Sequence, residues 1–318
     1  MKLSLEQMKQ ITVGALTVWE EDGVFRFAKC TPKQVEAWYN IETVLGERAE
    51  ATTGIRLDFH TDSHFFAFTT ANKVNYECYV DNVLTNTFFE KDFADGMSRR
   101  IELDGKEHRI TFYLPSHSVG KLASVELEDG ASMIPHKFDC KILFIGDSIT
   151  QGWESTWDSL SYGYHVSRFF NAESVVQGVG GGIFHVTTFD EAVDFDPDIV
   201  VVAYGTNDWH WYRTLEEGRD QCHGFLDLLT AKYRGKKLFG ISPIWRADQG
   251  ADDAEMGSFR ECADYVKEEI LGHGMILIDG ETLTPHLPDF YSDGFLHPDT
   301  KGFGIYALNL IMQMREYL

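Results

Sequence analysis

The hydrophobic pattern of this 318-residue chain changes its period once, near residue 140. Before that point, apolar and polar residues alternate in short β-branched and aromatic runs such as HFFAFTT (64–70) and HRITFYL (108–114). A period of two is typical of strands that bury one face. After that point, short continuous apolar runs alternate with segments of helical period, which indicates a parallel sheet covered on both faces. The chain is therefore expected to contain two domains of different class.

The first domain, residues 1–138, is predicted to be an antiparallel β-sandwich of the jelly-roll type. Its strand-like runs are residues 11–18, 54–61, 64–70, 74–80 and 108–114. Asp104-Gly105 lies between IEL (101–103) and KEHRITF (106–112), where a tight hairpin needs residues that tolerate a positive φ. A helical pattern in this domain is limited to the neighbourhood of TPKQVEAW (31–38).

The second domain, residues 139–318, is predicted to be an α/β domain with a five-stranded parallel sheet. Its apolar runs are KILFIG (141–146), AESVVQ (172–177), DIVVVAYG (198–205), KKLFGIS (236–242) and GMILID (274–279). Between and after these runs, apolar residues recur with helical spacing, as in Phe259, Cys262, Val266 and Ile270. Five βα units that end in a C-terminal helix are expected.

Open parallel sheets bind ligands at the carboxyl ends of their strands, so the residues that follow each run are the candidates for chemistry. Four segments there are unusual: GDSIT (146–150), GVGGG (178–182), GTND (205–208) and DGFLHP (293–298). They supply a hydroxyl, glycine-rich backbone, a side-chain amide, and an acid with an imidazole. Acyl transfer to serine requires this set of groups.

Each role in acyl transfer has a candidate residue. Ser148 follows the first strand as the nucleophile, and His297 supplies an imidazole that can act as general base and then general acid. Asp293 is close enough in sequence to orient the His297 ring. The oxyanion of the tetrahedral intermediate would be bound by the backbone N–H of Ser148, the backbone N–H of Gly181 and the side-chain amide of Asn207.

These four blocks resemble those of the SGNH/GDSL hydrolase family, which centre on Ser, Gly, Asn and His, and the resemblance covers roughly residues 141–318. It implies a flavodoxin-like SGNH hydrolase domain. The family usually places its acidic residue three positions before the histidine, but here that position is Gly294 and the aspartate is Asp293. Either the loop contains an extra residue and Asp293 still reaches His297, or another group orients the ring.

The preceding sandwich resembles, in architecture only, the two-domain carbohydrate esterases of the second family. That resemblance implies O-deacetylation of sugars and assigns no residue. Aromatic residues beside the catalytic segments favour a sugar over a fatty acyl chain, because a flat ring flanked by polar groups suits a pyranose. Trp209, Trp153 and Trp245 are the predicted substrate contacts, with Trp209 the first choice. Arg246 is expected in a surface ion pair, and Asp147 and Asp208 are expected to bind local backbone amides.

Composition excludes several other functions. The formal net charge of −22 disfavours nucleic acid, anionic membrane surfaces and anionic substrates. The histidines show neither an H-x-x-x-H nor an H-E-x-x-H spacing, and the glycine block lacks the dinucleotide fingerprint, so no metal and no cofactor is expected. Five widely spaced cysteines and the absence of an apolar leader segment predict a cytoplasmic protein with reduced thiols.

The sequence thus predicts a serine esterase that hydrolyses short acyl esters through an acyl-serine intermediate, with O-acetyl groups on a carbohydrate as the expected substrate. A thioesterase or lipase-type acylhydrolase of the same family is one alternative. A non-catalytic carbohydrate-binding protein on this scaffold is another. The expected partner is a small-molecule or oligosaccharide ester, and a homo-oligomer is left open.

Overall fold

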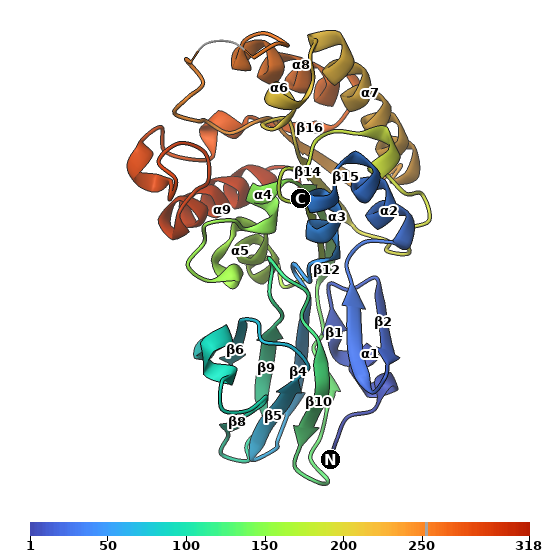
Figure 1. Cartoon of the computed structure of the whole chain (residues 1–318), viewed down its shortest axis with the longest axis vertical. Helices are drawn as coiled ribbons and strands as arrows, with labels where there is room; N and C mark the ends of the chain where they lie inside the picture. The colour runs from blue at the N-terminus through green and yellow to red at the C-terminus, as the bar shows by residue number, and fades with distance from the viewer. Residues whose placement is uncertain (252–253) are drawn as a thin grey trace. The chain divides into compact units, whose positions relative to one another are not determined.

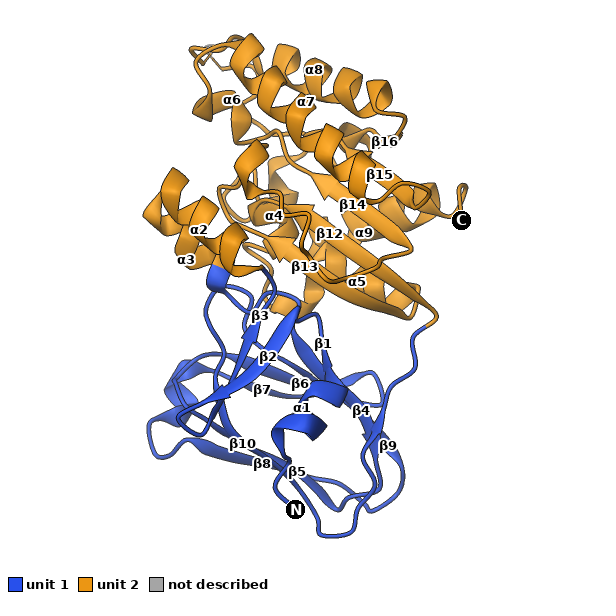
Figure 2. Ribbon diagram, turned by 90° about the vertical axis from the view of Figure 1, so that its right-hand side faces the viewer, with its two compact units in different colours: residues 1–30, 50–138 blue, residues 31–49, 139–318 orange. Residues whose placement is uncertain are grey.

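The computed structural model describes residues 1–251 and 254–318, which form two compact units. One unit comprises residues 1–30 and 50–138, and the other comprises residues 31–49 and 139–318 (Figure 2). The chain passes between the units three times, at residues 30–31, 49–50 and 138–139. The segment 31–49, which the sequence analysis assigned to the first domain, packs with the second unit instead.

The first unit consists of two antiparallel sheets, as the sequence predicted (Figure 1). One has the order β1-β4-β9-β6-β7, with β11 added beside β4, and the other has the order β2-β3-β10-β5-β8. The strands are β1 (Thr12–Val13), β2 (Thr17–Glu21), β3 (Val24–Ala28), β4 (Arg56–Thr61), β5 (Phe65–Thr70), β6 (Tyr76–Val80), β7 (Val83–Phe88), β8 (Ser98–Glu102), β9 (His108–Tyr113), β10 (Leu122–Leu127) and β11 (Ile134–Pro135). Alternate residues such as Phe66, Phe68 and Phe112 fill the core between the sheets.

Two local expectations for this unit are wrong. Asp104-Gly105 does not close a hairpin, because β8 pairs with β5 in one sheet and β9 pairs with β4 and β6 in the other. Gly105 does have the expected positive φ, +77°. The run 11–18 is not one strand: α1 (Leu5–Ile11), begun by a capping box between Ser4 and Gln7, ends where β1 starts, and Gly14 separates β1 from β2.

The second unit is built on a five-stranded parallel sheet with the order β13-β12-β14-β15-β16. Its strands are β12 (Cys140–Gly146), β13 (Ala172–Gly178), β14 (Ile199–Ala203), β15 (Lys237–Ile241) and β16 (Ile276–Ile278). All five coincide with the predicted apolar runs. The strand order is that of the flavodoxin-like fold, in which the first strand lies between the second and the third.

Helices cover the two faces of this sheet. They are α4 (Ser148–Gln151), α5 (Tyr162–Phe169), α6 (Asp208–Trp211), α7 (Leu215–Lys232), α8 (Phe259–Gly272) and α9 (Thr300–Met314). Phe239 and Ile241 of β15 share a core with α5 and α9, whereas Gly240 between them lies against Ile270 of α8. The pair α5–α9 therefore covers one face, and α7–α8 covers the other.

The connection from β13 to β14 lacks the predicted α-helix and contains one short 3₁₀ turn, η3 (Val186–Thr188). The helices α2 (Pro32–Ile41) and α3 (Thr43–Glu50) come from the other end of the chain, and α2 packs beside η3. Gln34 of α2 donates a hydrogen bond to Gln177 Oε1 (3.2 Å) and one to the Thr188 carbonyl (3.3 Å). The segment 31–49 thus supplies helical cover that the β13–β14 connection does not.

The remaining short helices are η1 (Glu90–Phe93), η2 (Asp158–Leu160), η4 (Gly280–Thr282) and η5 (Pro288–Phe290). Among the helices in the described part of the chain, none combines the length and the apolar character needed to cross a bilayer.

Candidate active site

Three of the candidate segments follow neighbouring strands whose last residues are paired with one another. Gly146 at the end of β12 pairs with Gly178 of β13 on one side and with Ala203 of β14 on the other. Ser148, Gly181 and Asn207 follow these strand ends by only a few residues. The strand β13 lies on one side of β12, and β14 lies on the other. The carboxyl ends of these strands therefore form the topological switch point at which such sheets bind ligands.

A continuous hydrogen-bonded chain joins the predicted nucleophile, base and acid. Ser148 Oγ lies 2.8 Å from His297 Nε2, and His297 Nδ1 lies 2.7 Å from Asp293 Oδ2. Burial opposes the charged form of Asp293, but hydrogen bonds from the backbone amides of Leu296 and Phe295 and from His297 outweigh it and lower the pKa of this carboxyl. Asp293 is then ionised and can only accept, so Nδ1 carries a hydrogen and Nε2 can take the serine proton.

The extra residue in the loop before His297 is accommodated by Gly294. This glycine has a φ of +79°, a conformation that residues with a Cβ rarely adopt, and its N–H donates to the Tyr291 carbonyl (3.0 Å). Asp293 Oδ1 accepts hydrogen bonds from the N–H groups of Phe295 (2.9 Å) and Leu296 (2.8 Å). One carboxylate therefore shapes the loop and also reaches the imidazole.

Side chains connect the loops that carry the proposed oxyanion donors. Gln151 Oε1 accepts the Gly180 N–H (2.6 Å), and Asn207 Nδ2 donates to the Gly182 carbonyl (2.9 Å). Gly181 has a φ of +79°, and a Cβ there would lie 3.1 Å from Arg48 Nη1. Arg48 itself donates to the Gly180 carbonyl (2.8 Å). Gly180, the residue before Gly181, is thus held at both its N–H and its C=O.

Two buried carboxyls lie beneath the site. Asp147 caps α4 by accepting the Ile149 N–H (2.9 Å), as expected. Asp208 accepts the Phe184 N–H (3.2 Å) from another segment of the chain, in addition to the expected local backbone amides of Gly205 and Asp208 itself. Burial raises the pKa of Asp147 to about 7 and that of Asp208 to about 8. These carboxyls support the loops rather than face the reacting atoms.

A family model agrees with this geometry. The model of the GDSL-like lipase/acylhydrolase family matches residues 144–305, about half of the chain. The chain belongs to this family. It is accordingly an ester hydrolase of the SGNH/GDSL type. No curated protein matches the chain.

Solved structures share the two-domain architecture of this GDSL-like hydrolase at low identity. A salicylyl-acyltransferase from a tetracycline biosynthetic pathway is 18% identical, with 96% of this chain and 94% of that chain covered and a TM-score of 0.77. A family two carbohydrate esterase from Cellvibrio japonicus is 15% identical, with 99% and 97% covered and a TM-score of 0.68. A family two carbohydrate esterase from Clostridium thermocellum, in complex with cellohexaose, is 15% identical, with 84% and 93% covered and a TM-score of 0.62.

The structure corrects the prediction that Trp209 is the first substrate contact of this GDSL-like hydrolase. Its side chain is 1% exposed, and its Nε1 donates to the Gly257 carbonyl (2.8 Å). The guanidinium of Arg246 lies 5.0 Å from the Trp209 ring and forms a two-fold hydrogen bond with Asp248. Arg246 is therefore in a buried ion pair rather than the expected surface pair, and Trp209 packs the α6 loop instead of facing solvent.

The other two predicted aromatic contacts are partly buried. Trp153 lies 6.3 Å from the His297 ring, donates its Nε1 to Gln151 (3.1 Å) and stacks under Arg48 at 4.8 Å. Trp245 stacks on His286 at 5.5 Å. Of the two, only Trp153 has a measured contact with the proposed catalytic residues.

Sequence reasoning missed Gln151 and Arg48. Gln151 directly follows the GDSIT block, so its place near the nucleophile could have been predicted from the sequence. Arg48 had no comparable signal, because it lies about 100 residues before Ser148 in a segment assigned to the other domain.

Proposed function

We propose that this GDSL-like hydrolase removes short acyl groups, most specifically O-acetyl groups, from a carbohydrate through an acyl-serine intermediate. The observation that carries the proposal is the unbroken chain from Ser148 Oγ through His297 to Asp293, with distances of 2.8 and 2.7 Å. A nucleophile, a base and a group that orients the base are then already in reacting order.

In the first half of the reaction, Ser148 Oγ attacks the ester carbonyl carbon while its proton passes to His297 Nε2. Asp293 stabilises the imidazolium that forms and keeps Nδ1–H in place. The carbonyl oxygen becomes an oxyanion, which accepts hydrogen bonds from the Ser148 N–H, the Gly181 N–H and the Asn207 amide. The bond between the carbonyl carbon and the alcohol oxygen then breaks, and His297 returns the proton to the alcohol.

In the second half, water replaces the alcohol. His297 Nε2 takes a proton from the water, whose oxygen attacks the acyl carbon, and the same donors bind the second oxyanion. Collapse of this intermediate breaks the bond to Ser148 Oγ, which recovers its proton from His297. The products are a free carbohydrate hydroxyl and a carboxylic acid, and all the protons are accounted for.

A groove in the catalytic unit supports a carbohydrate as the alcohol. It has a volume of about 510 Å³, and α2, the start of η3 and the end of α6 line it. Trp211 in its wall is 41% exposed and lies four residues after Asn207. Asn40, Glu36 and His185 supply polar groups to the same wall. An exposed indole among hydrogen-bonding groups suits a pyranose, whereas an acyl chain prefers an aliphatic lining.

The proposal is tested by hydrolysis of acetyl, butyryl and octanoyl esters of one chromogenic alcohol, alongside acetylated mono- and oligosaccharides. We expect kcat/KM to fall as the acyl chain lengthens and acetylated oligosaccharides to be hydrolysed. Ser148→Ala should reduce the rate by about 10³-fold or more while the melting temperature changes little. Ser155→Ala, on the loop after the nucleophile turn, is the matched control and should retain activity.

Other results would overturn parts of the proposal. Rates that rise with acyl length would contradict acetyl specificity and favour a lipase or thioesterase. Sugar binding without turnover in the unmodified chain would favour a carbohydrate-binding protein. Full activity of Ser148→Ala would remove Ser148 from the mechanism.

A further inference from the structure

Two pairs of metal-ligating side chains face each other across α7 and α8, on residues that the ester chemistry does not use. His223 and Asp227 are four residues apart on α7, and Glu269 and His273 are four residues apart at the end of α8. Residues with this spacing lie on the same side of a helix. Since α7 and α8 pack against each other, the two pairs meet.

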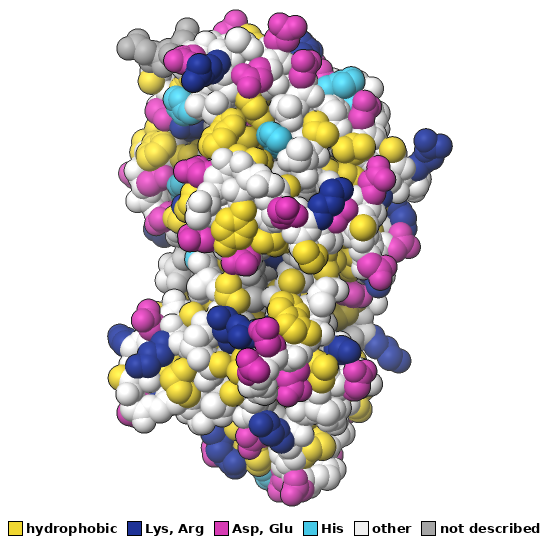
Figure 3. All heavy atoms as spheres, turned by 45° about the vertical axis from the view of Figure 1, so that its right-hand side comes forward, with side chains coloured by type: hydrophobic (Ala, Val, Ile, Leu, Met, Phe, Trp, Pro, Cys, Tyr) yellow, Lys and Arg dark blue, Asp and Glu magenta, His cyan; other side chains and the backbone are white. Residues whose placement is uncertain are grey.

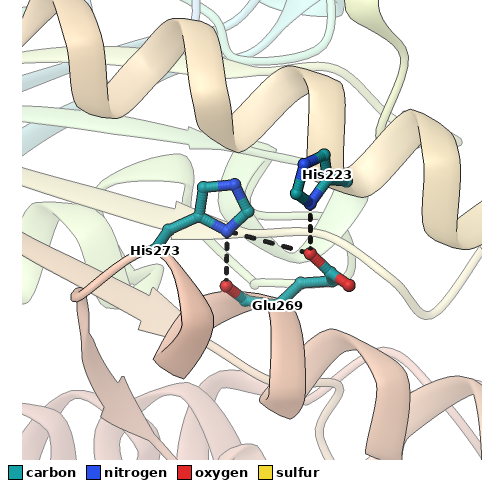
Figure 4. Close-up of side chains that lie close together, drawn as sticks. All are labelled: His223, Glu269 and His273. Carbon is teal, nitrogen blue, oxygen red and sulfur yellow. Dashed lines mark hydrogen bonds and ion pairs between the residues drawn. The ribbon is translucent and has the colours of Figure 1, made fainter.

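The three side chains at the centre of this cluster lie close together. His223, Glu269 and His273 each offer an atom that lies within 4.8 Å of the others. Figure 4 shows the two imidazole rings approaching Glu269 from different helices. The ring centroids are 4.8 Å apart. Asp227 completes the cluster, with its Oδ2 3.5 Å from His223 Nε2 and its Oδ1 3.3 Å from His273 Nε2.

Hydrogen bonds to Glu269 determine which ring nitrogens carry hydrogen. His273 Nδ1 lies 2.6 Å from the main-chain carbonyl of Glu269, which can only accept, so Nδ1–H donates. His223 Nδ1 lies 2.8 Å from Glu269 Oε2, and Arg219 holds Oε1 of the same carboxylate at 2.8 Å. In the neutral form of either ring, the lone pair is then on Nε2. Ligating histidines in metalloproteins are oriented by bonds of this kind.

His273 Nε2 has an unsatisfied lone pair. The His273 side chain is 7% exposed, and Nε2 is buried and makes no hydrogen bond with any described residue. Asp227 Oδ1 lies 3.3 Å from Nε2, and two lone pairs at that distance repel unless a proton or a metal ion lies between them. An edge of a zinc tetrahedron with bonds of about 2.1 Å is roughly 3.4 Å long. The separation of His223 Nε2 from Asp227 Oδ2 (3.5 Å) and that of His273 Nε2 from Asp227 Oδ1 (3.3 Å) are each close to that length.

We propose that His223 and His273, together with the carboxylates of Asp227 and Glu269, form a binding site for one divalent transition-metal ion such as Zn²⁺. The two Nε2 atoms and Asp227 are direct ligands, and Glu269 orients both rings. Imidazole nitrogen with carboxylate oxygen favours Zn²⁺ over Mg²⁺. The bound ion links α7 to α8. The sequence analysis expected no metal because it considered histidine pairs within one helix, whereas these ligands come from two.

The test is calorimetric titration of the untagged, chelator-treated chain with ZnCl₂, with MgCl₂ as a comparison. We expect one Zn²⁺ per chain, a higher melting temperature with Zn²⁺, and little response to Mg²⁺. His223→Ala and Asp227→Asn should each weaken zinc binding by about ten-fold or more. Both positions are largely exposed on α7, with 57% and 63% of the side chain accessible, so the fold should survive.

His64→Ala is the matched control. His64 is exposed and lies 2.6 Å from Glu128, but it belongs to the other unit, so its loss should leave zinc binding unchanged. His297→Ala removes the catalytic imidazole and should also retain the zinc site. The proposal is overturned if the unmodified chain takes up no Zn²⁺, or if His223→Ala binds it as tightly as the unmodified chain or as tightly as His64→Ala.

Discussion

At the scale of single residues, Asp208 is the most unusual group near the site. Its side chain is fully buried, Oδ1 accepts the Phe184 N–H, and Oδ2 has no hydrogen-bond partner among the described residues. Burial raises its pKa to about 8. The ordinary pKa of an aspartate is near 4. At pH values between that pKa and the raised one, Asp208 is protonated in the folded chain and ionised in the unfolded chain.

This difference predicts the pH dependence of stability. Unfolding releases the Asp208 proton, so a rise in pH favours unfolding, and the free energy of unfolding falls by up to about 1.4 kcal/mol per pH unit between the two pKa values. Asp208→Asn keeps an acceptor for Phe184 and removes the titration. We therefore expect Asp208→Asn to gain stability over the unmodified chain as the pH rises from 5 to 8, measured by urea unfolding.

Asp220→Asn on the exposed side of α7 is the control for Asp208→Asn and should follow the unmodified chain at every pH. Asp147, with a pKa raised to about 7, contributes a similar dependence that the Asp208 variant retains. A constant difference in stability between Asp208→Asn and the unmodified chain across this pH range would show that Asp208 is ionised in the folded state.

At the scale of elements, α3 contributes to the site through Arg48. Arg48 donates to the Gly180 carbonyl and stacks on Trp153, so it holds the peptide that presents the Gly181 N–H. Arg48→Met keeps the apolar stem and removes the donor. We expect kcat for an acetyl ester to fall about ten-fold or more with KM nearly unchanged, because an oxyanion donor acts mainly in the transition state.

The matched control for Arg48→Met is Arg100→Met in β8, an arginine that stacks on Phe65 at 3.6 Å in the other unit. It should leave both kinetic constants unchanged. A wild-type kcat for Arg48→Met with an altered melting temperature would assign Arg48 a purely structural role.

The sequence predicted the strands of the catalytic unit and the residues at their ends, since buried parallel strands are continuous apolar runs and their carboxyl ends lie at one edge. It could not predict which group orients His297, because that depends on the positive φ of Gly294. Docking of residues 31–49 was also unpredictable. Helical period shows which face of α2 is apolar, but not that Gln34 pairs with Gln177, 143 residues away.

Burial of single aromatic residues was the least predictable feature. Trp209 and Trp211 are two residues apart in a loop-like sequence, yet one is 1% exposed and the other 41%. The difference arises from α6, a single helical turn that directs Trp209 towards Arg246 and Phe259. A local pattern of four residues is too short to set a helical face.

At the scale of the whole molecule, charge governs which esters approach. The chain has 50 acidic against 28 basic side chains, a formal net charge of −22. Figure 3 shows acidic side chains scattered over the face it draws, with Lys and Arg between them. A field spread in this way acts at long range and slows the encounter with anions. An anionic ester should therefore react more slowly than a neutral ester of equal acyl size.

Salt separates this long-range effect from local recognition. The Debye length shrinks from about 30 Å at 0.01 M to about 10 Å at 0.1 M ionic strength, so screening should raise kcat/KM for an anionic ester by a few fold. A neutral ester of the same alcohol should change little, and a cationic ester should become slower. If the anionic ester instead loses activity with added salt, local basic groups, such as Arg48 at the Gly180 carbonyl, outweigh the net charge and attract anions.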